Sequence, residues 1–255
     1  MPADPLLRVR GLGKSYARGG AAFWAVRDVG FDLARGRTLG VVGSSGSGKS
    51  TLARCLAMVE PPTCGEIYLE GRRLGFGRRG AIQLIFQQPA ATLSPRFTAE
   101  EIVSEPLLIQ NRGTPSERRR TAIELMDLVG LPPGAGQRKA LEFSGGERQR
   151  LAIARGLALS PSLLILDESL SGLDLSIQAQ ILNLLVDLQE RRSLACILIS
   201  HDLGVVAQIA DEIAVMDAGT MVEHGAAAEL LARPRHPRTK ALLEAAAMLT
   251  PGGSR

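Results

Sequence analysis

The chain has 255 residues, a length that suits one α/β domain with an inserted helical lobe. It has 30 Lys and Arg against 26 Asp and Glu, and the net charge of only +4 argues against a nucleic-acid partner. Its three cysteines, Cys55, Cys64 and Cys196, show neither metal-ligand spacing nor a disulfide framework, which fits a reducing cytoplasm, and we expect Cys55 and Cys196 to be buried thiols. There is no secretory signal and no apolar run near the roughly 18–20 residues that a bilayer crossing needs, so a membrane pore would have to be another chain.

Short strands separated by glycines are expected over residues 6–42, including 7–9, 29–33 and 39–42. The last of these, Leu39-Gly-Val-Val, is an apolar run that directly precedes a glycine-rich loop. A short apolar run followed by a loop and a helix pattern is typical of a buried strand in an α/β sheet.

The glycine-rich loop has the spacing G-x-x-x-x-G-K-S, and a helix is expected from Lys49 to about Met58. Glycines let successive backbone N–H groups turn toward phosphate oxygens, and the helix start adds the positive end of its dipole. Lys49 can reach the β- and γ-phosphates, and the Ser50 hydroxyl can ligate Mg²⁺. A chance Gly/Ser turn is the alternative, but strand, loop and helix agree, so we expect a bound nucleoside triphosphate. The residues of this phosphate loop are Gly43, Ser44, Ser45, Gly46, Ser47, Gly48, Lys49, Ser50 and Thr51.

Strands are expected at 65–69 and 82–86, followed by a mostly helical stretch over about 88–160 that includes a helix at 115–129. Two helix starts in this stretch have capping-box spacing, in which a Thr and a Glu exchange hydrogen bonds with the helix's first N–H groups. The predicted boxes pair Thr98 with Glu101 and Thr114 with Glu117.

A third capping-box pattern, Ser144 with Glu147, precedes a helix that continues through Arg155. Gly145 and Gly146 leave the N–H groups of this helix start open, which makes a second anion site. An ordinary capped helix without a ligand is the alternative.

Four apolar residues at 163–166 precede two adjacent carboxylates, Asp167 and Glu168. The run indicates a buried parallel strand, whose carboxyl end is where an open α/β sheet places its chemistry. Asp167 can hold Mg²⁺, and Glu168 can orient or deprotonate an attacking water. A solvated acidic pair is the alternative, and the phosphate loop makes it the weaker interpretation.

A helix is expected over 176–190, followed by a buried strand over 195–199 with His201 just beyond it. A lone histidine after a strand usually has a structural role. The remaining expected elements are weak strands near 213–217 and 220–223 and a C-terminal helical segment over about 238–248.

The segment Leu141-Glu-Phe-Ser-Gly-Gly-Glu-Arg-Gln-Arg resembles the signature sequence of ATP-binding cassette (ABC) ATPases, and the resemblance extends over residues 6–245. It implies an α/β fold: a P-loop NTPase core with a mixed sheet, N-terminal antiparallel strands and an inserted α-helical lobe. The resemblance divides the single domain into a nucleotide-binding core at 6–87 and 161–225, a helical lobe at 88–160, and a tail at 226–255.

The resemblance also assigns roles to residues outside the phosphate loop. Tyr16 resembles the aromatic residue that stacks on adenine, although a lone Tyr is usually just partly buried surface. Gln87 resembles the residue that contacts Mg²⁺ and signals to a membrane partner, with the neighbouring Gln88 as the alternative.

In the family, the signature segment (Ser144, Gly145, Gly146 and Glu147) grips the γ-phosphate of ATP held by a partner subunit. Asp174 resembles a loop residue that couples the two subunits, and His201 resembles a switch histidine that contacts the γ-phosphate. The expected catalytic residues are Glu168, His201 and Lys49, and the expected Mg²⁺ ligands are Ser50, Gln87 and Asp167.

Stretches starting at Phe86, Ser176 and His236 resemble the ATPase subunits of dipeptide, oligopeptide and nickel importers. This implies an ATPase at the cytoplasmic face of the cell membrane that drives import of a small solute, with peptide favoured. The expected partners are a second ABC ATPase in a homo- or heterodimer, two integral membrane permeases and a separate solute-binding protein. A permease helix is expected to dock between Gln87 and about Pro106, where Ala91 is one candidate contact.

Four positions depart from this pattern. Glu147 stands where Gln is usual, Phe143 where Leu is usual, Ser169 where Pro is common, and Arg238 where the tail usually has an aromatic residue. Glu147 puts a negative charge at the second phosphate site, unless it bonds back to its own helix start.

Two other functions remain open on the sequence alone. One is a non-transport accessory ABC ATPase in a metabolic complex of the phosphonate-breakdown type. The other is a soluble ABC ATPase acting on nucleic acid or ribosomes, although the chain has neither a long coiled-coil insertion nor a second cassette.

Overall fold

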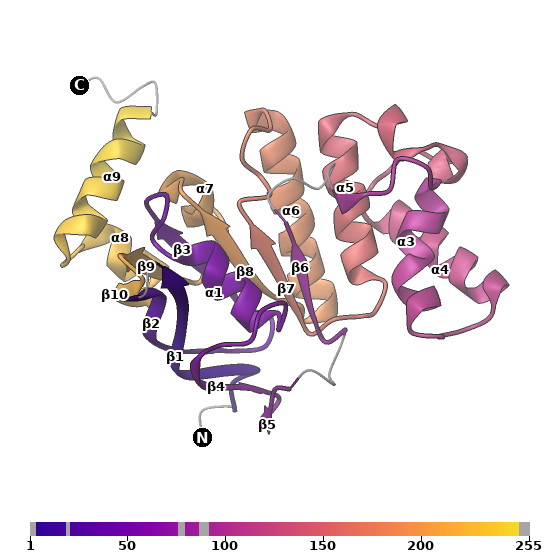
Figure 1. Cartoon of the computed structure of the whole chain (residues 1–255). Helices are drawn as coiled ribbons and strands as arrows, with labels where there is room; N and C mark the ends of the chain where they lie inside the picture. Colours follow the sequence, from indigo (N-terminus) through magenta and orange to yellow (C-terminus); the bar gives the residue numbers. More distant parts are fainter. Residues whose placement is uncertain (1–3, 19–20, 76–79, 87–91, 250–255) are drawn as a thin grey trace.

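The computed structural model describes residues 4–18, 21–75, 80–86 and 92–249. Within them the strands form two sheets, one with the order β2-β1-β4-β5 and one with the order β10-β9-β3-β8-β7-β6 (Figure 1). The strands of the first sheet are β1 (Leu7–Arg18), β2 (Ala21–Leu33), β4 (Cys64–Leu69) and β5 (Arg72–Arg73). Those of the second sheet are β3 (Thr38–Gly43), β6 (Ile82–Ile85), β7 (Leu163–Asp167), β8 (Ala195–Ser200), β9 (Glu212–Asp217) and β10 (Thr220–Ala226).

The second sheet is mixed, which confirms the predicted fold class. Its strands β9, β3, β8, β7 and β6 pair in parallel, and the edge strand β10 pairs antiparallel with β9. The first sheet is antiparallel throughout the paired residues. Parallel strands all have their carboxyl ends on the same side of the sheet, so the loops that follow them lie close together even when they are far apart in the sequence.

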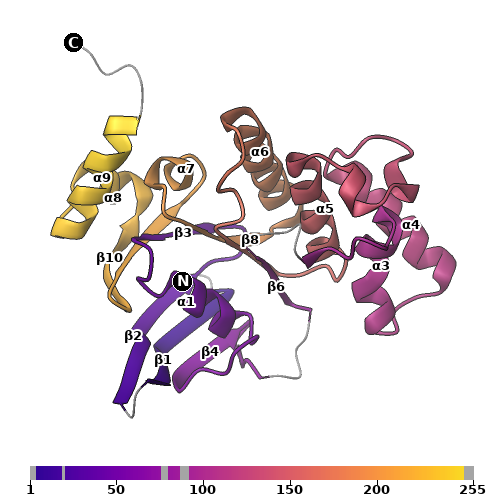
Figure 2. The ribbon, with the colours of Figure 1, turned by 45° about the horizontal axis from the view of Figure 1, so that its top comes forward.

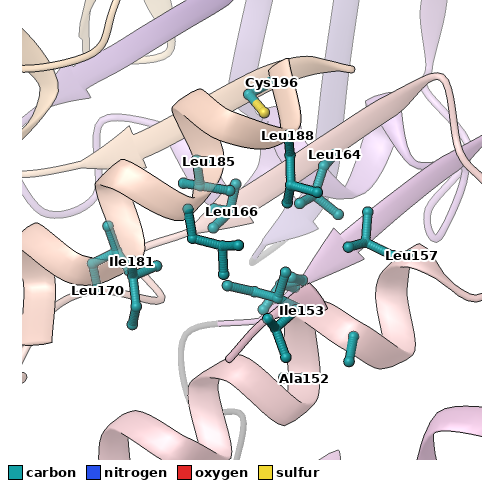
Figure 3. Close-up of a cluster of buried hydrophobic side chains, with 14 of the residues drawn as sticks. Ala152, Ile153, Leu157, Leu164, Leu166, Leu170, Ile181, Leu185, Leu188 and Cys196 are labelled. Carbon is teal, nitrogen blue, oxygen red and sulfur yellow. The ribbon is translucent and has the colours of Figure 1, made fainter. Parts of the chain in front are cut away.

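Both faces of the second sheet are covered, which explains why its strands are continuously apolar. Ile165 of β7 packs in a cluster with α1 (Lys49–Leu56) and the first sheet, whereas its neighbours Leu164 and Leu166 belong to the cluster on the opposite face. Figure 3 shows this second cluster, where side chains of α5 (Gly145–Leu157) and α6 (Leu175–Arg192) meet those of β7 and β8. The helices therefore hold the strand ends, and the loops that follow them, in fixed positions.

The helical lobe contains α3 (Ala99–Ile109), α4 (Pro115–Leu128), two short 3₁₀ turns (Ala135–Gln137 and Ala140–Glu142) and α5. All three predicted capping boxes are present, at Thr98, Thr114 and Ser144, with both reciprocal hydrogen bonds in each. An ion pair of 2.7 Å between Glu105 of α3 and Arg155 of α5 joins the lobe's first and last helices.

Several elements differ from the sequence-based expectation. The strands β1 and β2 form a longer ribbon than predicted, because cross-strand pairing carries them past register shifts in β1 that break the apolar alternation. Helix α1 ends at Leu56 rather than near Met58, which has a left-handed φ of 54°. The strand β5 and the short helices α7 (Leu203–Ala207) and α8 (Ala227–Ala232) were not predicted.

The C-terminal helix α9 (Pro237–Leu249) lies beside β9 and β10, at the opposite end of the molecule from α3 and α4 (Figures 1 and 2). Cys55 and Cys196 are buried as predicted, and Cys64 is exposed. In the described part of the chain, no helix has the length and apolar character that would let it cross a bilayer.

Candidate active site

The phosphate loop runs from the end of β3 to the start of α1, as its sequence predicts. Gly48 has φ of 101°, and a Cβ built there would lie 2.2 Å from the carbonyl oxygen of Ala25. A Cβ on Gly43 would lie 2.3 Å from the carbonyl oxygen of Met216 in the neighbouring strand β9. These glycines are therefore required by close backbone approach, and the loop is fixed against both β2 and β9.

Lys49 lies beneath this loop and is only 3% exposed. Its ammonium group donates hydrogen bonds of 2.9 Å to the carbonyl oxygens of Gly43 and Ser44, and it lies 3.6 Å from a carboxylate oxygen of Glu168. Burial lowers the pKa of Lys49, and the charge of Glu168 opposes that shift. The charged ammonium is thus held inside the loop, next to the carboxylate that follows β7.

Ser50 and Asp167 come together at the start of α1 and the end of β7. The Ser50 hydroxyl donates a 2.9 Å hydrogen bond to Asp167, whose side chain is 4% exposed. Burial raises the pKa of Asp167, the bond from Ser50 opposes this, and the charge of Glu168 adds to the rise.

A hydroxyl and a carboxylate side by side are hard oxygen donors of the kind that Mg²⁺ prefers. Among the described residues, no three His, Cys, Asp or Glu side chains form a cluster that could hold a metal on their own. Ser50 and Asp167 therefore fit Mg²⁺ bound mainly through a substrate's phosphates and water, because Mg²⁺ sites commonly use only one or two protein carboxylates.

Glu168 lies between Lys49 and His201. Its backbone has a left-handed φ of 46°, and its N–H donates to the carbonyl oxygen of Ile199 at 3.0 Å, which turns the chain out of the sheet after Asp167. One carboxylate oxygen faces Lys49, and the other lies 3.9 Å from Nδ1 of His201, which follows β8. The adjacent carboxylates thus point differently, as predicted from their positions at the strand end.

A cavity of about 590 Å³ opens over the phosphate loop. Tyr16 lines it, as does Glu168, so the structure brings the predicted adenine-stacking residue and the predicted base to one site. The Tyr16 hydroxyl donates a hydrogen bond to Glu60, which also lines the cavity.

Sequence reasoning missed four residues that line this cavity: Phe23, Ala25, Arg54 and Glu60. Phe23 pairs directly with Tyr16 across the β1–β2 ribbon. Two aromatic residues at 16 and 23 could have indicated a shared stacking surface, but only if both strands were known to extend that far. Arg54 lies on α1, 3.6 Å from Glu60, and nothing in the local sequence pointed to either of them.

The signature segment forms the start of α5 and contributes no residue to the lining of this cavity. Ser144 accepts a 3.3 Å hydrogen bond from the N–H of Glu147, and the Glu147 carboxylate accepts a 2.8 Å bond from the N–H of Ser144. The bond from that backbone N–H is the main reason that the pKa of Glu147 is lowered. The carboxylate is therefore partly occupied by its own helix start.

Gly146 of the signature segment lies against the first turn of α6, and Asp174 stabilises the start of that helix. A Cβ on Gly146 would lie 2.6 Å from the side chain of Ile177, so a larger residue would have to displace Ile177. Asp174 caps α6, because its carboxylate accepts a 2.9 Å bond from the N–H of Ile177. Gln87, Gln88 and Ala91 lie outside the described residues, so the structure does not address the roles predicted for them.

A groove of about 210 Å³ lies between β6, α3 and α5, and none of its lining residues belongs to the phosphate loop. Phe86, Pro106 and Ile109 give it an apolar wall, and Arg155, which is paired with Glu105, adds a polar group. Ile109 is 70% exposed, so its side chain is accessible on the rim of the groove.

Comparison with known proteins agrees with this geometry. Residues 26–171 match the model of the ABC transporter family. The chain is 48% identical over 238 residues to the dipeptide transport ATP-binding protein DppF of Escherichia coli, covering 91% of this chain and 71% of that protein. It is 45% identical over 260 residues to the dipeptide transport ATP-binding protein DppF of Haemophilus influenzae, covering 97% and 80%.

Solved structures give the same result. The dimeric ATP-binding cassette MJ0796, in a post-hydrolysis state bound to ADP and Pi, superposes with a TM-score of 0.78 at 29% identity, covering 87% of this chain and 98% of that one. The cbiO1 subunit from Clostridium perfringens, part of an ABC transporter complex, gives a TM-score of 0.80 at 26% identity, covering 94% and 99%.

Proposed function

The chain belongs to the ABC transporter family of ATPases, and from this premise we propose that it is the ATP-hydrolysing subunit of an importer for a small solute, most simply a short peptide. The relatives named as dipeptide transport ATP-binding proteins support this reading over an accessory metabolic ATPase or a nucleic-acid-linked one. Its place would be peripheral, at the cytoplasmic face of a membrane that its partners span.

One observation carries the catalytic part of the proposal. Lys49, Glu168 and His201 follow three different strands, yet Glu168 lies within 4 Å of both others. In this arrangement Lys49 binds the β- and γ-phosphates, Glu168 orients or deprotonates the attacking water, and His201 contacts the γ-phosphate.

Asp167 and Ser50 supply the oxygen atoms that would hold Mg²⁺. When bound, Mg²⁺ would neutralise phosphate charge that develops during transfer. Tyr16 and Phe23 provide aromatic faces at the other end of the cavity, where a purine base can stack.

The signature segment supports a dimer as the active unit. Its N–H groups do not face the cavity of their own chain, so they would contact the γ-phosphate only when a second ABC ATPase presents its phosphate loop. The dimeric cassette MJ0796 has a related fold and supports this arrangement. A homodimer and a heterodimer both satisfy this geometry.

Transport requires membrane partners, and we propose two integral permeases together with a solute-binding protein. The groove between β6, α3 and α5 suits a short amphipathic helix, because it combines apolar walls with the polar Arg155–Glu105 ion pair. Movement of the helical lobe as the dimer closes would then be passed to a permease docked there.

The test is uptake of labelled dipeptides into vesicles reconstituted with this ATPase, its permeases and its binding protein. We expect uptake that requires ATP on the ATPase side and stops with Lys49→Ala. ATP hydrolysis by the purified complex without uptake of any di- to pentapeptide would contradict the peptide assignment, and failure of the chain to copurify with permeases would contradict the importer assignment.

A further inference from the structure

The C-terminal helix α9 reaches the phosphate loop through a single side chain. The guanidinium of Arg238 donates a 2.9 Å hydrogen bond from Nη2 to the Ser44 hydroxyl and a 3.0 Å bond from Nε to the carboxylate of Asp217. Ser44 follows the end of β3, and Asp217 ends the neighbouring strand β9. Arg238 is also the residue that departs from the aromatic usual at this position.

The first turn of α9 is fixed, so Arg238 is presented to the loop from a rigid base. The carboxylate of Glu223, on β10, accepts hydrogen bonds from the N–H groups of Arg235 (2.9 Å) and His236 (3.0 Å) and from the Thr239 hydroxyl. Thr239 is fully buried. Burial raises the pKa of Glu223, but these hydrogen bonds outweigh burial and lower it overall, so the carboxylate stays charged at neutral pH.

Ser44 is connected to the rest of the phosphate loop. Its carbonyl oxygen accepts the 2.9 Å bond from Lys49 and a 3.2 Å bond from the N–H of Ser47. Ser47 in turn accepts a 3.0 Å bond from the N–H of Gly219, in the turn between β9 and β10. The loop is thus held from the C-terminal side of the chain at two points, the turn and Arg238.

We propose that Arg238 is a positioning residue for the nucleotide: through Ser44 it holds the first half of the phosphate loop in the shape that receives phosphate. Because Asp217 lies against the guanidinium and balances its charge, the effect comes from orientation rather than from added positive charge. The pair is partly exposed, so its contribution to overall stability is small. The inference rests on the proposed role of the phosphate loop in binding ATP.

A double-mutant cycle tests it, with the dissociation constant of MgATP as the readout. Arg238→Ala and Ser44→Ala should each weaken binding roughly three- to tenfold, since each removes one charge-assisted hydrogen bond. The dissociation constant of the double variant should be no higher than that of the single variant with the higher dissociation constant, because both changes remove the same contact. Arg238→Lys should recover part of the affinity.

Arg235→Ala is the matched control. Arg235 lies just before the same helix, its side chain is 83% exposed, and that side chain pairs with Glu229 and not with the phosphate loop. It should leave affinity unchanged. Hydrogen exchange of the nucleotide-free loop, residues 43–51, should be faster in Arg238→Ala and unchanged in Arg235→Ala, which separates a local effect from general loss of folding.

Two outcomes distinguish failure of this inference from failure of its premise. If Lys49→Ala abolishes ATP binding while Arg238→Ala and Ser44→Ala bind as wild type, Arg238 does not position the loop. If Lys49→Ala binds as wild type, the loop is not the phosphate site and the proposal falls with it. Additive losses in the double variant would also overturn the proposal, because they would show that the two residues act independently.

Discussion

The ammonium of Lys49 lies 3.6 Å from the carboxylate of Glu168, although the two residues are 119 positions apart in the chain. Without nucleotide, the ammonium is shared between this carboxylate and two carbonyl oxygens of the phosphate loop. An ATP γ-phosphate would compete for the same ammonium. Binding would therefore loosen the Lys49–Glu168 contact and leave the carboxylate available to an attacking water.

Glu168→Gln should keep ATP binding and lose most turnover. Removing a general base or water-positioning group typically costs roughly 10²–10⁴-fold in rate, while the amide still fits between Lys49 and His201. The measurement is steady-state ATPase activity, with partner subunits present, beside equilibrium binding of ATP. A variant with near-normal turnover would show that Glu168 is not the base.

Lys49→Ala should act on binding itself. It removes the cation that would meet the phosphates and leaves the carbonyl oxygens of Gly43 and Ser44 without their donor inside the loop. We expect ATP affinity to fall by roughly tenfold or more, since hydrogen bonds to charged groups contribute about 1.5–3 kcal/mol. Calorimetric titration with MgATP checks this, and an unchanged dissociation constant would contradict the assignment.

Asp167→Asn should stabilise the nucleotide-free protein at neutral pH. Burial raises the pKa of Asp167, so the folded state binds the proton more tightly than the unfolded chain, and the ionised carboxylate costs stability above the folded pKa. That cost disappears as the pH falls toward the unfolded value of about 3.9. The neutral amide avoids it and can still accept the bond from Ser50.

Thermal unfolding of wild type and Asp167→Asn across this pH range gives the comparison. The variant should unfold at a higher temperature near pH 7, with the difference shrinking on acidification. It should also lose the dependence of ATP affinity on Mg²⁺. A variant that is less stable than wild type at neutral pH would contradict the sign of the effect.

Local patterns predicted much of the fold. The capping boxes at Thr98, Thr114 and Ser144 fix where three helices begin, because each depends only on residues three positions apart. The apolar run before Asp167 correctly predicted a strand buried on both faces. Such signals are contained within one element, so one sequence is enough to show them.

What the sequence did not predict depends on contacts between distant segments. The length of the β1–β2 ribbon comes from cross-strand pairing, so Phe23 was not expected beside Tyr16. The contact of Arg238 with Ser44 spans 194 positions, and although the sequence drew attention to each residue, no local pattern predicts that they meet. The motifs indicated the candidate phosphate-binding residues, but the side chains that support them are visible only in three dimensions.

ATP should drive dimerisation, most clearly when hydrolysis is blocked. Since the signature segment does not line the cavity of its own chain, we expect a monomer to lack half of each ATP site. We expect wild type alone to be mainly monomeric and slow, and Glu168→Gln with ATP to shift toward dimer in light scattering. Lys49→Ala added to Glu168→Gln is the control and should stay monomeric.

Full ATPase activity in a strictly monomeric preparation would contradict the shared site. If the natural partner is a related second ATPase, the self-dimer will be weak, and mixing the two chains should then raise activity. Absence of any association under both conditions would overturn the dimer proposal.

The groove between β6, α3 and α5 gives the last prediction, on coupling to a permease. Ile109→Glu places a charge on its apolar wall, where a docking helix would have to bury it at considerable cost. We expect ATP-driven uptake in reconstituted vesicles to fall at least tenfold, a change of about 1.4 kcal/mol or more in coupling free energy, while ATP binding by the purified subunit stays unchanged. Leu108→Glu is the matched control, because Leu108 is the preceding residue of α3 and is 56% exposed, but it does not line the groove. Uptake that survives Ile109→Glu, or falls equally with Leu108→Glu, would place the permease contact elsewhere on the helical lobe.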